Sequence, residues 1–432
     1  MSVRMKHTEL TPAANEGTRL TGGLSRYQLL VLLVAWLGWV FDSMDATIYN
    51  LVLTPALREL LGSRSTPENI AWYGGIILAI FLVGWALGGI LLGIVADYWG
   101  RARTLVIAIL IYAVFTGLAG FAHTWWELAI YRFITALGVG GEWASGAILV
   151  AEALPESLRV KGAGVLQSAW GAGYFLAAGV NLLLSERSWR VMFFVGVLPA
   201  LVGLFALLKV HEPERWKETR PSGTNRLTLW ELFAPQRRRD TLVGSALAFV
   251  AVFGLWGATN WTPSLVRELI EPGRLAAAEI TQRVSYAVMS LNAGAMVGYF
   301  SFPPLAERTG RRLAFAVMMA GSAITLPAAF LTPRSYLSML AILPALGFFT
   351  NGIFSGFPIY LPELFPTRIR ATGAGFCFNA GRVLAASGPF ITGYLVALLG
   401  SFARAASAVA LIYLLGMLVL LFARETKGRA LA

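Results

Sequence analysis

The stretch Asp-Tyr-Trp-Gly-Arg at residues 97–101 decides the fold of this chain, because its pattern of acid, glycine and arginine returns at residues 307–311 as Glu-Arg-Thr-Gly-Arg. A second pattern, Glu-x-x-Pro-x-x-x-Arg-x-x-Gly, occupies residues 152–162 and returns at residues 363–373 at nearly the same offset. A chain that repeats whole loops at a constant spacing has repeated a structural unit. The sequence therefore predicts two related halves.

The segments between these loops are strongly apolar. Hydrophobic residues make up 57% of the chain and charged residues 13%, which favours a membrane protein over a soluble domain. Twelve apolar runs can cross about 30 Å of hydrocarbon, at roughly 20 residues each. Because the runs are continuous rather than alternating, we predict an all-α membrane protein of twelve transmembrane helices in two six-helix pseudo-repeats. The predicted spans are residues 27–57, 70–95, 104–122, 126–151, 162–184, 189–209, 241–263, 283–304, 313–331, 336–361, 371–399 and 402–423.

The basic residues predict the orientation of the chain. Most of the 35 Lys and Arg residues fall on one side if the N-terminus is cytoplasmic, and cytoplasmic loops are the ones enriched in basic residues. We therefore expect a multi-pass protein of the inner or plasma membrane with both termini in the cytoplasm. The expected parts are an N-terminal tail at 1–26, a six-helix bundle at 27–209, a cytoplasmic linker at 210–240, a second bundle at 241–423 and a C-terminal tail at 424–432.

Several classes of protein do not fit the sequence. The net charge of +12 comes from basic groups scattered over short loops, so we expect no nucleic-acid partner. The histidines His7, His123 and His211 are far apart, and Cys377 is the one cysteine, so neither a metal site nor a disulfide is expected. The chain contains no Walker-type phosphate loop. We expect no cofactor and no enzyme activity, and a gradient as the driving force.

The loop at residues 93–103 carries the pattern Gly-x-x-x-Asp-x-x-Gly-Arg-x-Arg between the second and third predicted spans. With the twelve spans and the six-plus-six repeat, this pattern resembles the major facilitator superfamily over residues 25–430. Residues 362–370, 212–216 and 425–428 resemble the corresponding loops of its sugar-porter-like branch. The resemblance implies a transporter that works by alternating access.

Other stretches resemble the organic-acid:proton symporters, including the aromatic-acid and sialic-acid groups. These are Ala-Trp-Leu-Gly-Trp at residues 35–39, which leads to Asp42 and Asp45, and Gly-Gly-Glu-Trp at residues 140–143. The paired glutamines that hexose porters carry in the seventh span are missing, and residues 253–257 read Phe-Gly-Leu-Trp-Gly there. The comparison disfavours a hexose as the substrate.

Two acids in the first predicted span point to proton coupling, because ionisable residues inside a membrane are costly and functional by default. Asp42 and Asp45 lie three residues apart on one helix face, with Tyr49 one turn beyond Asp45. Two carboxylates close together in a low dielectric cannot both ionise easily, so we expect one of them to carry a proton. The alternative is that both stay ionised in a structural ion pair.

Arg132 and Glu142 lie in the fourth predicted span. Arg132 is about 10 Å deep at 1.5 Å per residue and needs a carboxylate partner. The resemblance to proton-coupled sugar porters implies that Asp45 is this partner and the proton site, while a static ion pair stays open. Glu142 is either a second proton site or part of a salt bridge near the cytoplasmic surface.

Arg382 in the eleventh span offers a bidentate fork for the carboxylate of an anionic substrate. A fixed salt bridge between the halves, or a helix-end contact, is the alternative. Aromatic and amide side chains of the inner spans are the usual lining of a midplane pocket. The candidates are Trp36, Tyr49, Gln167, Trp170, Tyr174, Trp256, Asn260, Tyr286, Asn292, Asn351, Tyr360 and Asn379.

The repeated loops predict a cytoplasmic gate. We expect Arg101 and Arg103 to meet Glu152. In the second copy, we expect the arginines at 311 and 312 to meet the glutamate at 363. Such pairs would latch helix ends together in the outward-open state, although a purely topogenic role is the alternative. The gate candidates are Asp97, Gly100, Arg101, Arg103, Glu152, Arg159, Glu307, Gly310, Arg311, Arg312, Glu363 and Arg370.

Two functional hypotheses follow from the sequence. The first is a proton symporter for a small organic anion, such as an aromatic acid, a sugar acid or another carboxylate. The second is a transporter of a neutral sugar or polyol, and efflux of a small organic solute also stays open. Under either hypothesis the expected partners are the substrate, a proton and the lipid bilayer, and the chain is expected to be monomeric.

Overall fold

The computed structural model describes residues 23–184, 188–219, 228–257, 262–270, 277–385, 388–429 and 431. Within these residues the regular structure is entirely helical. The first half contains α1 (Arg26–Leu61), α2 (Pro67–Trp99), α3 (Arg101–Ala119), α4 (Trp125–Ala153), α5 (Glu156–Leu184), α6 (Trp189–Val195) and α7 (Pro199–Lys209). Two short helices follow in the linker, α8 (Glu214–Thr219) and α9 (Thr228–Glu231).

The second half repeats this order with more breaks. It contains α10 (Arg238–Gly257), α11 (Thr262–Ile270), α12 (Ala277–Thr309), α13 (Arg311–Leu331), α14 (Tyr336–Gly352), α15 (Phe357–Leu364), α16 (Arg370–Ala385), α17 (Gly388–Leu399), α18 (Phe402–Val409) and α19 (Leu411–Leu421). A 3-10 segment at Ile353–Gly356 joins α14 to α15, and another at Thr367–Ile369 precedes α16. Predicted spans at 189–209, 336–361 and 402–423 are therefore each made of two consecutive helices.

Side-chain caps mark where several helices begin. The Ser25 hydroxyl accepts a hydrogen bond from the Gln28 N–H and the Gln28 side chain accepts from the Ser25 N–H, which is a capping box at the start of α1. At the start of α4, the Thr124 hydroxyl accepts a hydrogen bond from the Glu127 N–H, three residues further along the chain. Polar caps at the ends and apolar interiors explain why these segments are helices of membrane-spanning length.

Nine helical segments of the described chain are long and apolar enough to cross a membrane. The predicted spans at 162–184, 283–304 and 371–399 are not among them. Their helices, α5, α12 and α16, pack against the opposite half, α5 on α12 and α16 on α2. Helices at such an interface carry polar groups, as α16 does with Arg370 and Arg382, and this lowers their apolar character.

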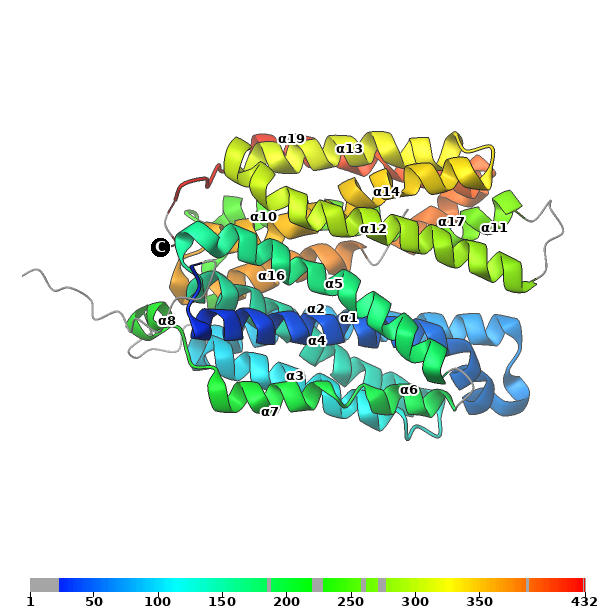
Figure 1. The fold of residues 1–432 in the computed structure, drawn as a ribbon, viewed down its shortest axis with the longest axis horizontal. Helices are drawn as coiled ribbons and strands as arrows, with labels where there is room; N and C mark the ends of the chain where they lie inside the picture. Colours follow the sequence, from blue (N-terminus) through cyan, green and yellow to red (C-terminus); the bar gives the residue numbers. More distant parts are fainter. Residues whose placement is uncertain are drawn as a thin grey trace, which may run out of the picture.

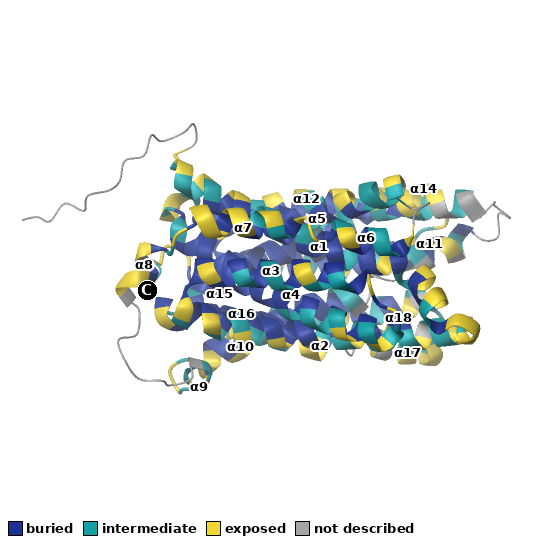
Figure 2. Cartoon of the chain, turned by 90° about the horizontal axis from the view of Figure 1, so that it is seen from below, coloured by how far each residue is buried: buried dark blue, intermediate teal, exposed yellow. Residues whose placement is uncertain are grey.

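The two halves lie side by side with their helices roughly parallel (Figure 1). Helices α1, α2, α3, α4, α6 and α7 form one layer of the view, and α12, α13, α14 and α19 form the other. The start of α1, the linker helix α8 and the C-terminus share one end of the bundle. Figure 2 shows buried residues along the middle of the bundle and exposed ones on its outside.

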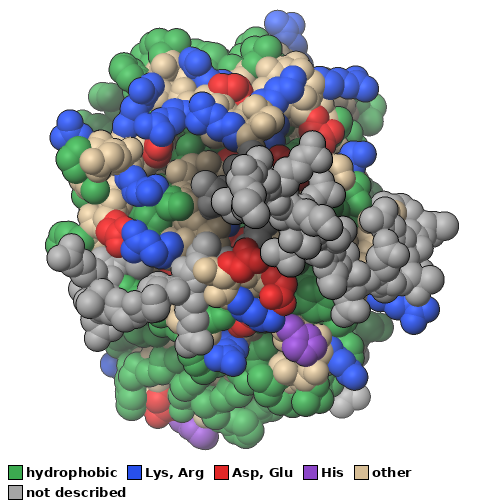
Figure 3. All heavy atoms as spheres, turned by 90° about the vertical axis from the view of Figure 1, so that its left-hand side faces the viewer, with side chains coloured by type: hydrophobic (Ala, Val, Ile, Leu, Met, Phe, Trp, Pro, Cys, Tyr) green, Lys and Arg blue, Asp and Glu red, His purple; other side chains and the backbone are tan. Residues whose placement is uncertain are grey.

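Basic side chains gather on the end that carries the linker and the C-terminus. Figure 3 looks at this end and shows many Lys and Arg side chains beside few Asp and Glu. We refer to it below as the terminal end, because the described chain begins and finishes there. Its charge is what an end facing the cytoplasm is expected to carry.

Candidate functional site

Asp45 and Arg132 form a buried ion pair between α1 and α4. The Arg132 Nη1 donates to both Asp45 oxygens, at 2.9 and 2.7 Å, and the Thr116 hydroxyl of α3 donates to Asp45 Oδ1 at 2.8 Å. The guanidinium carbon lies 4.8 Å from the centre of the Tyr49 ring and 4.3 Å from that of Phe81. Sequence reasoning paired the two charged residues through a family resemblance and missed Thr116, which carries no sequence signal of its own.

Asp42 has a different partner, although it lies only three residues earlier on α1. Its carboxyl group interacts with Glu142 of α4, and both side chains are buried. Apart from each other, the Asp42 oxygens and the Glu142 Oε2 have no hydrogen-bond partner among the described residues. A Cβ at position 38 would overlap the Glu142 carboxylate, so Gly38 is the residue that lets this acid reach α1.

This arrangement corrects two expectations. Asp42 and Asp45 do not form the carboxylate pair, because Arg132 holds Asp45 and the pair is Asp42 with Glu142. The salt bridge considered for Glu142 near the cytoplasmic surface is absent from the ion pairs of the described chain. Residues on different helices set these contacts, and spacing along one helix does not reveal them.

Arg382 reaches the same region from α16 of the second half. Its guanidinium carbon lies 3.8 Å from the Trp85 ring centre and 4.9 Å from that of Phe378. Asp42 is its electrostatic partner, yet no direct ion pair joins the two in the described chain. The Arg382 Nε and Nη1 have no hydrogen-bond partner among the described residues. A buried guanidinium held mainly by aromatic faces has donors left for a ligand.

Aromatic rings surround Asp42, Glu142 and Arg382. Trp170 of α5 lies 5.4 Å from Trp39 and 6.1 Å from Trp85, measured between ring centres. Trp143 of α4 stacks on Phe378 of α16 at 4.0 Å and an interplanar angle of 14°, across the two halves. Sequence reasoning named only Trp170 of these as a pocket residue, although Trp39 and Trp143 belong to the two motifs that resemble organic-acid symporters. Trp85 lies in a glycine-rich run at residues 84–89, and this run was the sequence signal that could have indicated Trp85.

The space at this site is small in the present conformation. A cavity of about 10 Å³ beside Glu142 is lined by Ala35, Trp39 and their neighbours on α4 and α5, which is roughly the room of one water molecule. We call Asp42, Glu142, Arg382 and the surrounding rings of Trp39, Trp85, Trp143, Trp170 and Phe378 the central cluster. Unsatisfied polar groups buried in an aromatic shell are the features of a closed binding site.

The remaining pocket candidates are spread over the molecule. The Asn379 amide donates to Gly375 O in its own helix at 2.9 Å, and its Oδ1 has no hydrogen-bond partner in the described chain. Asn292 likewise donates to its own helix, and Asn351 meets Tyr299 inside the second half at 3.4 Å. Gln167 is buried, and Tyr174 and Trp256 are half-buried.

Three further candidates do not join the central cluster. The Tyr360 hydroxyl donates to Arg424 O at the terminal end, and Tyr286 is about half exposed. Trp36 donates from its Nε1 to the Ser168 hydroxyl at 3.2 Å. Asn260 lies outside the described residues.

The gate candidates of the first loop copy join the two halves at the terminal end. Asp97 accepts from the Ala371 and Thr372 N–H groups at 3.1 and 2.8 Å, and from the Thr372 hydroxyl at 2.6 Å. These donors belong to the first turn of α16, which has no acceptors of its own for them. Asp97 also pairs with Arg101 at 3.0 Å. A carboxylate of α2 therefore caps a helix of the opposite half.

Three further buried contacts strengthen this junction. Arg101 pairs with Glu152 at 3.1 Å and donates to Thr367 O at 2.5 Å, and Arg370 pairs with Glu152 at 2.6 Å. Arg159 donates to Ala151 O in its own half. These contacts close the terminal end in this conformation.

The second copy forms its own ion pair within the second half. Arg311 meets Glu363 at 2.7 Å, as expected. Arg103 and Arg312 do not meet the glutamates predicted for them. Arg312 donates from Nε to Leu420 O at 3.1 Å, and Arg103 contributes its backbone N–H instead.

The acceptors for these backbone groups lie after α7 and α19. Glu212 accepts from the N–H groups of residues 102 and 103 at 3.2 and 3.0 Å. Glu425 accepts from those of residues 311 and 312 at 2.9 and 3.1 Å. Burial raises the pKa of Glu425, but four backbone N–H donors outweigh burial and hold the pKa below its usual value. Sequence reasoning missed the role of both acids.

The molecule has two helical halves around a buried charged cluster, and contacts between the halves close one end. This is the architecture of a membrane transporter. The sequence matches the family model "Major Facilitator Superfamily" over residues 35–302 and the model "Sugar (and other) transporter" over residues 278–432. The chain belongs to the major facilitator superfamily.

Its relatives are transporters of small molecules. It is 32% identical to the "Putative metabolite transport protein" of Haemophilus influenzae, covering 95% of this chain and all of that one. It is 32% identical to the "Probable 4-methylmuconolactone transporter" of Cupriavidus pinatubonensis, over 91% and 90% of the two chains. It is 30% identical to the "Cis,cis-muconate transport protein" of Acinetobacter baylyi, over 85% and 87%.

A solved structure supports the fold. The proton:xylose symporter XylE, bound to 6-bromo-6-deoxy-D-glucose, superposes with a TM-score of 0.76 at 20% identity, covering 94% of this chain and 98% of that one.

Proposed function

We propose that this protein is a proton symporter that carries a small organic anion by alternating access. The anion would be an aromatic acid, a sugar acid or another carboxylate. The names of the muconolactone and muconate transporters support an organic acid as the substrate class. The observation that carries the proposal is the central cluster, where Asp42 of the first half interacts with both Glu142 and the buried Arg382 of the second half.

The cluster has the groups that such coupling requires. Two carboxyl groups in contact favour a state in which they share one proton, because like charges disfavour double ionisation. Arg382 would bind the carboxylate of the substrate with its free donors, and the tryptophan rings would bind an apolar or cyclic body. Proton and anion would then load together, since the proton removes a negative charge that would repel the substrate.

Asp45 and Arg132 would contribute a second ionisable pair. In this proposal Arg132 releases Asp45 when that carboxyl group takes a proton, and the freed guanidinium keeps its contact with the rings at 49 and 81. A buried charge that loses its partner is costly, so the exchange would be tied to the conformational change. A static role for this pair is the alternative.

The proposal includes how the chain lies in the membrane. Twelve transmembrane spans, six in each of the bundles 27–209 and 241–423, would cross the inner or plasma membrane, with the linker and both tails in the cytoplasm. The basic terminal end supports this orientation. Its closed contacts would then make the present conformation one that is shut toward the cytoplasm. We propose that a monomer is sufficient for transport, because the cluster is built from one chain.

Uptake into proteoliposomes tests the proposal. A labelled panel of aromatic acids, sugar acids, short carboxylates and neutral hexoses is offered with and without an inward proton gradient. We expect an acid to accumulate with the gradient, and we expect a protonophore, Glu142→Gln or Asp45→Asn to abolish the accumulation. Glu214→Gln is the matched control, because that acid is exposed and, within the described part of the chain, its ion pair is with Lys217 of the linker.

A neutral sugar or polyol is the second candidate, supported by the sugar-transporter model that matches residues 278–432. Gradient-independent equilibration of a neutral solute that survives Arg382→Gln would favour this candidate and contradict the first. Accumulation of an acid that is unchanged in Glu142→Gln would contradict the assigned coupling site.

A further inference from the structure

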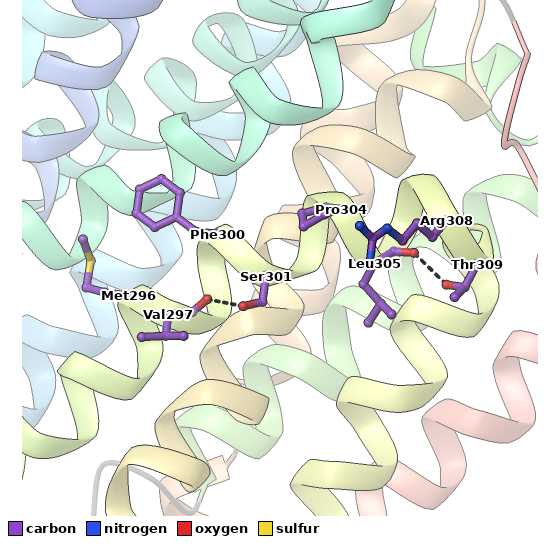
Figure 4. Close-up of a pocket in the computed structure, with 8 residues that line it drawn as sticks. All are labelled: Met296, Val297, Phe300, Ser301, Pro304, Leu305, Arg308 and Thr309. Carbon is purple, nitrogen blue, oxygen red and sulfur yellow. Dashed lines mark hydrogen bonds between the residues drawn. The ribbon is translucent and has the colours of Figure 1, made fainter.

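A groove along the outer face of α12 lies apart from the central cluster. It has a volume of about 580 Å³, and none of its lining side chains is an acid: they are Met296, Val297, Phe300, Ser301, Pro304, Leu305, Arg308 and Thr309. Figure 4 shows these side chains, all from α12, with Met296 at one end and Arg308 and Thr309 at the other. The groove is much larger than the cavity at Glu142 and contains none of the coupling residues.

The groove is apolar along most of its length. Val297 and Phe300 are 59% and 50% exposed, and Met296 and Leu305 also line it. From residue 296 to residue 308 the helix rises about 18 Å, at 1.5 Å per residue. This is close to the depth of one leaflet of hydrocarbon, which is about 15 Å. The length and the chemistry fit one acyl chain lying along the helix.

The groove ends in positive charge at the terminal end of the bundle. Arg308 is exposed, and the Lys427 Nζ donates to the Arg308 carbonyl oxygen at 2.8 Å, so a second cation lies against the last turn of α12. The acids nearby lie outside the groove: neither Glu307 nor Glu425 lines it, and Glu425 faces the backbone N–H groups at the start of α13. An apolar channel that opens onto two cations is complementary to an amphiphile with an anionic head.

We propose that this groove binds an anionic phospholipid from the leaflet at the terminal end. Its phosphate would contact Arg308 and Lys427, and an acyl chain would lie along residues 296–305. Basic groups at the membrane interface attract anionic lipids with about 1 kcal/mol per charge. The apolar surface of the groove would favour a lipid, which has acyl chains, over a free phosphate. The bound lipid would lie beside the seam between the halves, because Met296 and Pro303 of α12 abut the glycines at 171 and 164 of α5.

Native mass spectrometry of the delipidated full-length protein tests the head-group site. Phosphatidylglycerol and phosphatidylcholine with the same chains are titrated separately. We expect phosphatidylglycerol to bind more tightly, and we expect Arg308→Gln to weaken it about fivefold, which corresponds to about 1 kcal/mol. Arg334→Gln is the matched control, an exposed arginine that precedes α14 and does not line the groove. Equal affinity for both lipids, or equal loss in both variants, overturns the proposal.

A second measurement locates the acyl chain. Ser301 is accessible and Cys377 is fully buried, so a fluorophore attached to Ser301→Cys labels the groove while the parent chain stays unlabelled. Phosphatidylglycerol with brominated chains should quench this label more than brominated phosphatidylcholine does, and Arg308→Gln should remove the difference. Equal quenching by the two lipids would show that the groove only faces bulk lipid. Neither measurement depends on which solute is transported.

Discussion

In the first copy of the repeated loop, Asp97 accepts three hydrogen bonds from the first turn of α16 in the other half. In the second copy, the side chain of its counterpart Glu307 has no hydrogen bond or ion pair within the described chain. The same sequence pattern therefore joins the halves on one side and not on the other. A duplicated motif can share its local structure without sharing its long-range contacts.

The local structure of the two copies is indeed the same. Gly100 and Gly310 both have positive φ, 124° and 94°, which favours glycine over residues with a side chain. A Cβ at either position would overlap a carboxylate, that of Glu212 in the first half and that of Glu425 in the second. Each acid caps the helix that follows its glycine, α3 or α13. Short-range sequence determines this turn in both halves.

The difference arises where the helices cross. On α2, Gly89 and Gly93 let the opposite helix α16 approach, since a Cβ at these positions would overlap Asn379 or lie 2.9 Å from Ala371 O. The repeat offset places Tyr299 and Pro303 of α12 at the matching positions. There Tyr299 donates to Asn351 of its own half and Pro303 lies against Gly164 of α5, and no contact like that of Asp97 forms among the described residues.

Loss of the carboxylate at position 97 should produce the largest difference between the two copies of the loop. Asp97→Ala removes the acceptor of three hydrogen bonds and a buried partner of Arg101, and breaking such a pair costs about 3–5 kcal/mol. We expect the terminal end to open and transport to fall at least tenfold. Spin labels at Arg103→Cys and Thr309→Cys, both exposed, measure the separation of the halves. Glu307→Ala is the matched control with little expected change, and equal opening in both variants would refute the asymmetry.

A methyl group at Gly93 should have the next largest effect. Gly93→Ala places its Cβ 2.9 Å from a backbone carbonyl of α16 that cannot rotate away. We expect the labelled distance to lengthen and transport to slow several-fold. Gly179→Ala on α5 meets nothing within 4 Å and is the control, for which helix propensity alone predicts a neutral or stabilising change. If Gly93→Ala behaves like the control, close approach is not what forms the latch.

Removal of the two caps should have smaller and nearly equal effects. Glu212→Gln and Glu425→Gln each leave one acceptor atom at the start of α3 or α13, so we expect a loss of about 0.5–1 kcal/mol each. The midpoint of thermal unfolding should fall by about 2–4 °C per kcal/mol. Thermal unfolding in detergent checks this expectation. A much larger effect in one half would mean that the caps are not equivalent.

The smallest expected effect is a pH dependence in the second half. The folded pKa of Glu425 lies below its unfolded value, so its contribution to stability is present above pH of about 4.3 and is lost as the pH falls through the folded pKa. We expect the difference in unfolding midpoint between the parent chain and Glu425→Gln to shrink on going from pH 7 to pH 3.5. Because the carboxylate is partly exposed, the change should stay below about 1 kcal/mol. A difference that is constant with pH would contradict the charge-based account.

Much of the molecule could be predicted from the sequence, because it depends on local chemistry. Apolar runs predicted the helices, the repeat predicted two related halves, and family resemblance predicted the superfamily shown by the matched models. The contacts of Arg101 with Glu152 and of Arg311 with Glu363 were predicted from repeated spacing, and the structure contains both. Each of these features follows from residue type and distance along the chain.

The tertiary structure decided which groups meet across helices. Asp42 and Asp45 occupy neighbouring turns of α1, yet Arg132 holds one and Glu142 contacts the other. The approach of α2 to α16, which no period in the sequence encodes, brings Trp85 to Arg382 and Asp97 to the start of α16. Partners in a helical bundle depend on how closely helices pack, and small residues at crossings set that distance. The sequence by itself determined the helices and their order, and packing decided which of their charges are paired.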